Sequence, residues 1–249
     1  MSETRTREAG DVRNRLAVAL DVDDVVQATR LARELRPWFG VAKVGLELFS
    51  AAGPDAVVEM VGLGYRVFLD LKLHDIPTTV RRAAQVVGAL GASYLTLHAT
   101  GGPSMLHAGV EGLAEGASRA GLPPPTALAV TVLTSDPDAP PHVLAKRVGA
   151  AVEARCGGVV CSASDVHVTK QLAPRLVTVV PGIRAPGAST HDQARTSTPQ
   201  AAIDAGADLL VVGRAVTEAP DRADAASKMV GHLLLERRRE ADDGPGASR

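Results

Sequence analysis

Short apolar runs recur along the chain, and each is followed by an amphipathic stretch rich in Ala, Leu and Arg. The runs are almost continuously apolar rather than alternating, which is typical of strands that are buried on both faces. Amphipathic helices between such strands supply the crossovers that parallel pairing requires. The runs lie at residues 16–22, 41–45, 65–71, 92–98, 126–133, 157–162, 175–180 and 207–213. The pattern therefore predicts eight parallel strands with helices between them.

Eight strand and helix units in one domain predict an α/β protein with the (β/α)8 TIM barrel fold. Glycines such as Gly91 and Gly206 precede strands, where a helix often ends in the left-handed conformation. An open, doubly wound sheet is the alternative fold, but no Gly-x-Gly-x-x-Gly motif follows the first strand. No linker interrupts residues 16–236, so we predict a single barrel domain there. The polar ends, residues 1–15 and 237–249, are predicted to be disordered.

Polar residues interrupt the apolar pattern where the predicted strands end. In a TIM barrel the carboxyl ends of the strands form the face that carries the active site. Each polar residue alone could be a loop residue or a helix cap. Their shared position at one end is harder to explain that way, because strands bury ionised groups only when these are paired. The residues are Asp21, Lys43, Asp70, Lys72, Asp75, His98, Thr134, Arg184 and Arg214, the last of which follows Gly213.

The third run carries the most informative group of charges. Asp70 and Lys72 are two positions apart, so both side chains should lie on the same side of the strand. If Lys43 also points inward, the barrel mouth holds an alternating row of charges with Asp75 nearby. Carboxylates beside Lys72 favour its ammonium form, which suits a proton donor or a fixed positive charge better than a Schiff-base lysine. A purely structural network of ion pairs is the alternative.

The last two strands predict a phosphate site. Barrels often bind phosphate with the loops that follow strands seven and eight. Gly213 would let backbone amides approach an anion, and Arg214 could bind it through two hydrogen bonds. The loop after strand seven is long, carries Arg184, and could close over a ligand so that Gln193 reaches the same phosphate. A solvated surface loop is the alternative for this segment.

Composition limits the classes of partner. The chain has 27 basic and 28 acidic residues and a net charge of −1, so we expect neither nucleic acid nor a membrane as a partner. The chain has no apolar run long enough to span a membrane, and its first residues lack an apolar segment, so we expect no membrane span and no signal peptide. We interpret Cys156 and Cys161 as buried thiols in a reducing cytoplasm. The cysteines and histidines lack the spacing of a metal site, so no metal is predicted.

The segment DLKLHDIPTT, residues 70–79, matches the Asp-x-Lys-x-x-Asp-Ile-Pro-x-Thr signature of the orotidine 5′-monophosphate decarboxylase family. The chain resembles this family from about Leu16 to the helix after Arg214, and the blocks LDV, KVG, LHATGG, VLTS, PGIR, DQAR and ADLLVVGR occur in the family's order. The resemblance implies decarboxylation of orotidine 5′-monophosphate (OMP) to uridine 5′-monophosphate (UMP), in pyrimidine synthesis. It also implies a cytoplasmic homodimer that needs neither cofactor nor metal.

The same resemblance implies roles for the site residues. Lys72 would stabilise and protonate the carbanion at C6 of the pyrimidine, and Asp70 would lie against the departing carboxylate. Asp75 and Thr79 would reach the site from the partner subunit, and Asp75 would complete the row of charges that includes Lys43. The remaining contacts would be made to ribose by Asp21 and Lys43, to the pyrimidine by Thr134, and to phosphate by Gln193, Gly213 and Arg214, with Arg184 in the closing loop.

Two other functions remain open. Keto-gulonate-phosphate decarboxylases and hexulose-phosphate synthases share the Asp-x-Lys-x-x-Asp pattern but use magnesium and sugar phosphates. Ile76, Pro77 and Thr79 argue against this group, and a chelator-sensitive activity would favour it. A barrel that binds nucleotides without catalysis is the third possibility, and nucleotide binding without turnover would identify it.

Overall fold

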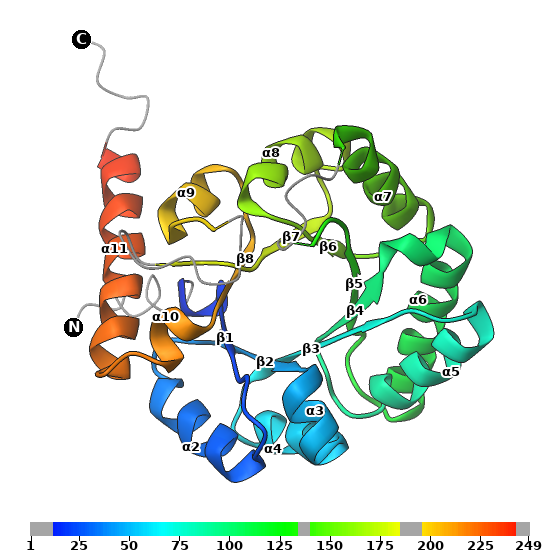
Figure 1. The fold of residues 1–249 in the computed structure, drawn as a ribbon, viewed down its shortest axis with the longest axis horizontal. Coiled ribbons are helices and arrows are strands. Elements are labelled where there is room, and N and C mark those ends of the chain that lie inside the picture. Colours follow the sequence, from blue (N-terminus) through cyan, green and yellow to red (C-terminus); the bar gives the residue numbers. More distant parts are fainter. Residues whose placement is uncertain (1–11, 134–139, 185–195, 243–249) are drawn as a thin grey trace.

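The computed structural model describes residues 12–133, 140–184 and 196–242. The eight predicted strands are present, and they close into one parallel barrel in chain order, with β8 paired to β1. Figure 1 looks into the barrel, with the helices arranged around it. The strands are β1 (Leu16–Ala19), β2 (Val41–Gly45), β3 (Arg66–Leu73), β4 (Tyr94–His98), β5 (Thr126–Val130), β6 (Gly158–Val160), β7 (Val177–Val180) and β8 (Leu209–Val212). The predicted TIM barrel is thereby confirmed.

The helices begin with the signals expected of them. Asp24 accepts a hydrogen bond from the Gln27 amide at the start of its helix, and Thr198 does the same for the Ala201 amide. Proline occupies the first turn of several others, where its missing N–H costs nothing. The helices are α2 (Val25–Leu35), α3 (Leu46–Ala52), α4 (Pro54–Gly62), α5 (Pro77–Gly88), α6 (Gly102–Arg119), α7 (Pro141–Glu153), α8 (Ala163–Leu172), α9 (Pro199–Asp204), α10 (Arg214–Thr217) and α11 (Arg222–Asp242), with a 3₁₀ turn, η1 (Ala99–Gly101).

The core has two layers, one on each side of the strands. On β1, Leu16 and Val18 pack in the larger cluster between barrel and helices, whereas Ala17 and Ala19 pack inside the barrel with Phe68. Both sets are buried, which explains why the strands are continuously apolar. This alternation also settles which residues reach the barrel mouth, because every second residue of a strand faces the interior.

Helices α5 and α6 approach each other at glycines. A Cβ atom on Gly112 would lie 2.1 Å from the Arg81 carbonyl oxygen, and one on Gly116 would lie 1.9 Å from that of Gln85. Only glycine permits this separation of the two backbones. The Arg81 side chain also forms an ion pair with Glu115. The start of α5, which follows the charged segment of β3, is held against α6 by this contact.

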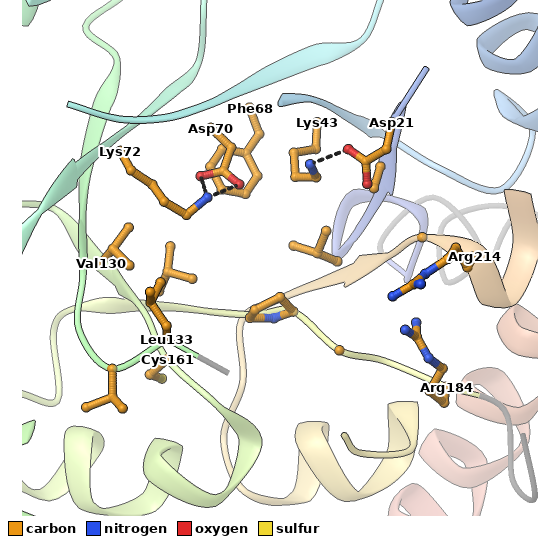
Figure 2. A pocket seen from close by; sticks show the side chains of 17 residues that line it. Asp21, Lys43, Phe68, Asp70, Lys72, Val130, Leu133, Cys161, Arg184 and Arg214 are labelled. Atoms are coloured by element: carbon orange, nitrogen blue, oxygen red, sulfur yellow. Dashed lines mark hydrogen bonds and ion pairs between the residues drawn. The ribbon is translucent and has the colours of Figure 1, made fainter. Parts of the chain in front are cut away.

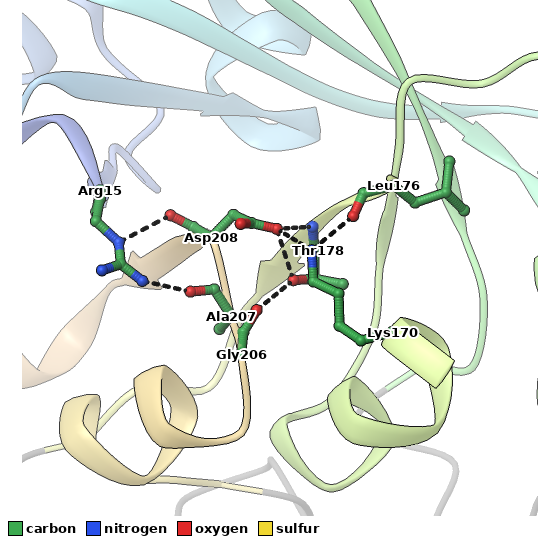
Figure 3. Close-up of polar contacts among 7 residues, drawn as sticks. All are labelled: Arg15, Lys170, Leu176, Thr178, Gly206, Ala207 and Asp208. Atoms are coloured by element: carbon green, nitrogen blue, oxygen red, sulfur yellow. Dashed lines mark hydrogen bonds and ion pairs between the residues drawn. The ribbon is translucent and has the colours of Figure 1, made fainter. Parts of the chain in front are cut away.

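A second polar cluster lies at the amino ends of the last strands (Figure 3). Oδ2 of Asp208 accepts hydrogen bonds from the Lys170 ammonium at 2.6 Å, from the Thr178 amide at 2.7 Å and from the Thr178 hydroxyl at 2.9 Å. Lys170 also donates to the Leu176 carbonyl, and Arg15 donates to the Ala207 carbonyl at 2.7 Å. These contacts join α8, β7, β8 and the residue before β1 at the point where the barrel closes.

The ends of the ordered domain differ from the predicted boundaries. Val12 is buried in the core and the Arg13 carbonyl accepts a hydrogen bond from the Gly40 amide, so residues 12–15 pack on the barrel although we assigned them to a disordered segment. Helix α11 continues past residue 236 to Asp242. Residues 1–11 and 243–249 lie outside the described residues. Among the described helices, none has both the length and the apolar character needed to cross a membrane.

Candidate active site

A pocket opens at the carboxyl ends of the strands, as the barrel fold requires. Its apolar lining includes interior-facing residues such as Ala19, Phe68 and Val211. Its charged residues are Asp21, Lys43, Asp70, Lys72, Arg184 and Arg214. Six of the predicted polar residues therefore meet in one cavity, together with Gly213.

Two ion pairs form one side of the pocket. Nζ of Lys72 lies 2.9 Å from both carboxylate oxygens of Asp70, and Nζ of Lys43 lies 2.8 Å from Oδ1 of Asp21. Figure 2 shows the four side chains in the order Lys72, Asp70, Lys43, Asp21 across adjacent strands. Lys43, Asp70 and Lys72 of the predicted row line the pocket together, but Asp75 does not, and Lys43 is hydrogen-bonded to Asp21. Lys43 is the most buried of the four, with 12% of its side chain exposed, and Asp21 the most open, with 55%.

Strand β3 is irregular at its charged residues. Leu69 pairs with Leu95 and Leu73 pairs with Leu97, so three residues of β3 lie opposite the single residue Thr96. The bulge adds an even number of residues, and therefore keeps the alternation that turns Asp70 and Lys72 to the same side. Lys72 has a φ of 49°, in the left-handed region that a lysine rarely occupies. The sequence predicted the shared side correctly but gave no sign of the bulge.

At the bulge, a hydrogen bond to a side chain takes the place of a backbone hydrogen bond between β3 and β4. The Lys72 amide donates to the hydroxyl of Thr96 at 2.8 Å, and this hydroxyl lies 3.0 Å from Oδ1 of Asp70. Thr96 is fully buried. We did not predict it as a site residue; the one available signal was a hydroxyl within an otherwise aliphatic stretch of β4.

Two arginines lie on the other side of the pocket. Arg184 follows β7 and is 7% exposed, and Arg214 begins α10 directly after Gly213. Figure 2 shows both guanidinium groups pointing into the cavity, opposite the two ion pairs. The pocket therefore has a side that suits an anion and, across from it, a side in which acids and ammonium groups are already paired.

The other predicted site residues do not line this pocket, or are not described. Asp75 and Thr79 are exposed at the start of α5, where Oδ1 of Asp75 accepts a hydrogen bond from the Ile76 amide at 2.6 Å. Thr134 and Gln193 lie outside the described residues. The pocket of one chain thus brings together the residues of β1, β2, β3, β7 and β8 but leaves Asp75 and Thr79 on the surface beside it.

His98 ends β4 and does not line the pocket. Its ring stacks on His74 with the ring centres 5.5 Å apart, and its Nδ1 accepts a hydrogen bond from the Thr100 amide. Burial, followed by His74, Arg147 and Lys72, lowers the pKa of His98 and so favours the neutral ring.

The two cysteines are buried, as predicted, and Cys161 lines the pocket. Burial raises the pKa of Cys156 to about 12, so its thiol is protonated at neutral pH. Within the described ranges, no group of three or more His, Cys, Asp and Glu residues is arranged to hold a metal ion.

Comparison with known proteins gives a consistent result over nearly the whole barrel. A family model described as "Orotidine 5'-phosphate decarboxylase / HUMPS family" matches residues 14–229. The chain is 45% identical over 230 residues to orotidine 5'-phosphate decarboxylase from Anaeromyxobacter sp. (strain K), which covers 88% of this chain and 98% of that protein. It is 43% identical over 232 residues to the protein of the same name from Thermobifida fusca, covering 88% of this chain and 95% of that protein.

Solved structures show the same likeness. The crystal structure of orotidine 5'-phosphate decarboxylase from Lactobacillus acidophilus matches with a TM-score of 0.71 and 33% sequence identity. The match covers 88% of this chain and 98% of that one. Sequence and three-dimensional similarity therefore extend over the same barrel.

Proposed function

This chain belongs to the orotidine 5'-phosphate decarboxylase / HUMPS family, and from that premise we propose that it converts OMP to UMP and carbon dioxide in pyrimidine biosynthesis. The observation that carries the proposal is the Lys72 and Asp70 pair, which faces two arginines across one pocket at the catalytic end of the barrel. A substrate with a phosphate at one end and an acidic ring carboxylate at the other matches this division of charge.

Lys72 is proposed as the residue that acts on the ring. When the bond between C6 and the carboxyl carbon breaks, the electron pair stays on C6 and carbon dioxide leaves. A fixed ammonium beside C6 stabilises this negative charge more in the transition state than in the ground state, because the charge on C6 appears only as the bond breaks. Lys72 then donates a proton to C6 and recovers one from solvent.

Asp70 holds the ammonium in place through both carboxylate oxygens. A preorganised charge needs no rearrangement at the moment of reaction, which is the main advantage of such a pair over solvent. We propose that Asp70 also lies against the substrate carboxylate, and that Lys43 contributes a second positive charge to the row. The Lys43 and Asp21 pair is assigned to the ribose hydroxyls, to which an ammonium can donate and from which a carboxylate can accept hydrogen bonds.

The opposite side of the pocket is assigned to the phosphate. Arg214 and the Gly213 backbone lie at the end of β8, and Arg184 lies at the end of β7. We propose that Gln193 joins them when the substrate is bound and that Thr134 contacts the pyrimidine. We propose that binding energy from the phosphate, which is remote from C6, serves to close the loop after β7 over the substrate.

We also propose that the active unit is a cytoplasmic homodimer, to which each subunit contributes Asp75 and Thr79 across the interface. Both residues are exposed beside the pocket, and the neighbouring Ile76 has 67% of its surface exposed. Leu46, at the start of α3, is 57% exposed. Large exposed apolar side chains such as these suit a covered surface better than open solvent. Sedimentation analysis at assay concentrations tests the proposal, and a fully active monomer would contradict it.

The decisive assay follows the loss of orotate-ring absorbance with purified protein and OMP in excess chelator. Turnover under these conditions supports the proposal. Activity on a sugar phosphate that disappears with chelator would move the chain to the magnesium-dependent branch of the family instead. Calorimetric binding of UMP without turnover of OMP would leave a nucleotide-binding barrel.

A further inference from the structure

We propose that Thr96 is a positioning residue for the reaction: its buried hydroxyl fixes both the carboxylate of Asp70 and the backbone of Lys72. The inference rests on the proposed decarboxylation but concerns a residue outside the pocket lining. It is based on two hydrogen bonds, one strand irregularity and the complete burial of one side chain.

The position of Thr96 follows from the barrel's alternation. Tyr94, two residues earlier on β4, packs against the cluster inside the barrel, whereas Leu95 and Leu97 pack outside it. Thr96 therefore faces the interior, opposite the three residues by which β3 bulges. It is the single residue of β4 between Leu95 and Leu97, whose pairings with β3 flank the bulge. Its side chain therefore contacts a backbone group of β3 that has no partner in the regular hydrogen bonding of the sheet.

The hydroxyl of Thr96 can accept one hydrogen bond and donate another, and both are needed between Lys72 and Asp70. It accepts a hydrogen bond from the Lys72 amide at 2.8 Å and donates its own hydrogen to Oδ1 of Asp70 at 3.0 Å. One group thus connects the main chain of the lysine to the carboxylate that its ammonium contacts. The contacts form a closed ring from the Lys72 amide through Thr96 and Asp70 to the Lys72 ammonium.

The backbone of Lys72 explains why such a ring is needed. A lysine with φ of 49° lies in the left-handed region, which is less favourable for a side chain than ordinary strand geometry. Such a conformation persists only where the surroundings determine it. The hydrogen bond from the Lys72 amide to Thr96 is a contact that the regular strand conformation would lose. Thr96 therefore stabilises the bulge, and the bulge aims the ammonium.

Substituting valine for Thr96 tests the proposal with little change of shape. Thr96→Val removes both hydrogen bonds, and a displaced ammonium should lower kcat by about 100-fold. Binding of UMP, which depends on the ribose and phosphate contacts, should change by less than about threefold, because those residues lie elsewhere in the pocket. Thr96→Ser keeps the hydroxyl and should keep kcat within about fivefold of the unchanged protein.

Thr178→Val is the matched control. Thr178 is also a fully buried strand threonine whose hydroxyl contacts the aspartate of a lysine and aspartate pair, but at the other end of the barrel. It should lower the melting temperature and leave kcat unchanged. A Thr96→Val protein with unchanged kcat would overturn the proposal, and so would equal losses in kcat and UMP affinity or a Thr96→Ser protein as impaired as Thr96→Val.

Two further measurements cover failure to fold and failure of the proposed function. If Thr96→Val does not fold, Thr96→Ala is compared with Thr96→Ser by the same criteria. In the unchanged protein, hydrogen exchange at the Lys72 amide should be slow, and fast exchange would overturn the inference whether or not any variant folds. An unchanged protein that does not turn over OMP would reject the proposed function, while slow exchange at Lys72 would still support the geometry.

Discussion

The barrel carries a lysine and aspartate pair at each end, and the two pairs are bonded differently. At the amino ends of the strands, Oδ2 of Asp208 accepts three hydrogen bonds from within the protein, and Lys170 donates to a carbonyl as well as to Asp208 (Figure 3). At the carboxyl ends, the Lys72 ammonium donates only to Asp70 among the groups that the structure describes (Figure 2). An ammonium has three donors, so part of its capacity faces the pocket.

The contrast separates stability from chemistry more reliably than residue type does. Both pairs have short contacts, 2.6 Å at Asp208 and 2.9 Å at Asp70, and both are partly exposed. What differs is how many hydrogen-bond donors and acceptors of each pair remain available to a ligand. Lys170 and Asp208 use theirs to close the barrel, whereas Lys72 and Asp70 are held in position with capacity left over. Changes at the two ends should therefore affect different measurements.

The largest effect is expected at Lys72. Lys72→Ala removes the proposed proton donor and the positive charge proposed to lie beside C6, and should lower kcat roughly 10⁴-fold or more in the orotate absorbance assay. Its melting temperature should change little, because the side chain is one third exposed and bonded to one partner. Lys170→Ala is the counterpart, with normal kcat and a lower melting temperature. The comparison would be wrong if Lys72→Ala lowered the melting temperature and kept kcat while Lys170→Ala lowered kcat and kept the melting temperature.

The pocket's arginines should affect binding more than chemistry. Arg214→Ala removes the charged hydrogen bonds that we propose to the phosphate, and should raise KM for OMP about 10- to 100-fold. Arg222→Ala is a suitable control, since Arg222 begins α11 at the surface and bonds to the Thr217 carbonyl and Glu34. An unchanged KM in Arg214→Ala would show that the phosphate binds elsewhere.

Asp208→Asn addresses the other end directly. The amide keeps the shape but loses the charge that three donors share, which should lower the free energy of unfolding by about 1 to 3 kcal/mol. Since Asp208 directly precedes β8, at the opposite end of the strand from the pocket, kcat per folded molecule should stay within about twofold. Urea unfolding and the absorbance assay on the same preparation test both statements. A loss of kcat without a loss of stability would contradict them.

The sequence predicted the barrel and most of the pocket because both depend on local pattern. Continuous apolar runs identify doubly buried strands, and polar residues at their carboxyl ends must converge once the barrel closes. Asp21, Lys43, Asp70 and Lys72 are therefore brought together as expected. The alternation argument for Asp70 and Lys72 also holds, since the bulge in β3 preserves it.

Features that depend on pairing between distant strands were not predictable. The bulge at Lys72 exists because of how β3 and β4 align, and nothing within residues 70–73 indicates it. Thr96 acquires its two contacts only through that alignment. Val12 is similar: one apolar residue in a polar segment carries no signal, yet it packs in the core. The positions of Asp75 and Thr79 relative to a second subunit likewise depend on an association that one chain does not contain.

The smallest effect is expected for the dependence of stability on pH. Burial alone would raise the pKa of Asp208, but hydrogen bonds from Lys170 and from the amide and hydroxyl of Thr178 lower it below its ordinary value of 3.8. The unfolded chain therefore binds this proton at a higher pH than the folded chain does. The pair's contribution to stability is complete above about pH 4 and is lost as the pH falls through the lower folded value. Asp208→Asn has no such proton to bind. The difference in the free energy of unfolding between Asp208→Asn and the unchanged protein should therefore become smaller at low pH. It should shrink by about 1 kcal/mol or less when urea unfolding is repeated from pH 6 down to about pH 3. Other carboxylates titrate in both proteins and cancel in the difference. A deficit that stays constant over this range would mean that the charge of Asp208 does not hold the barrel closed, and the contrast between the two ends would then rest on the Lys72 pair alone.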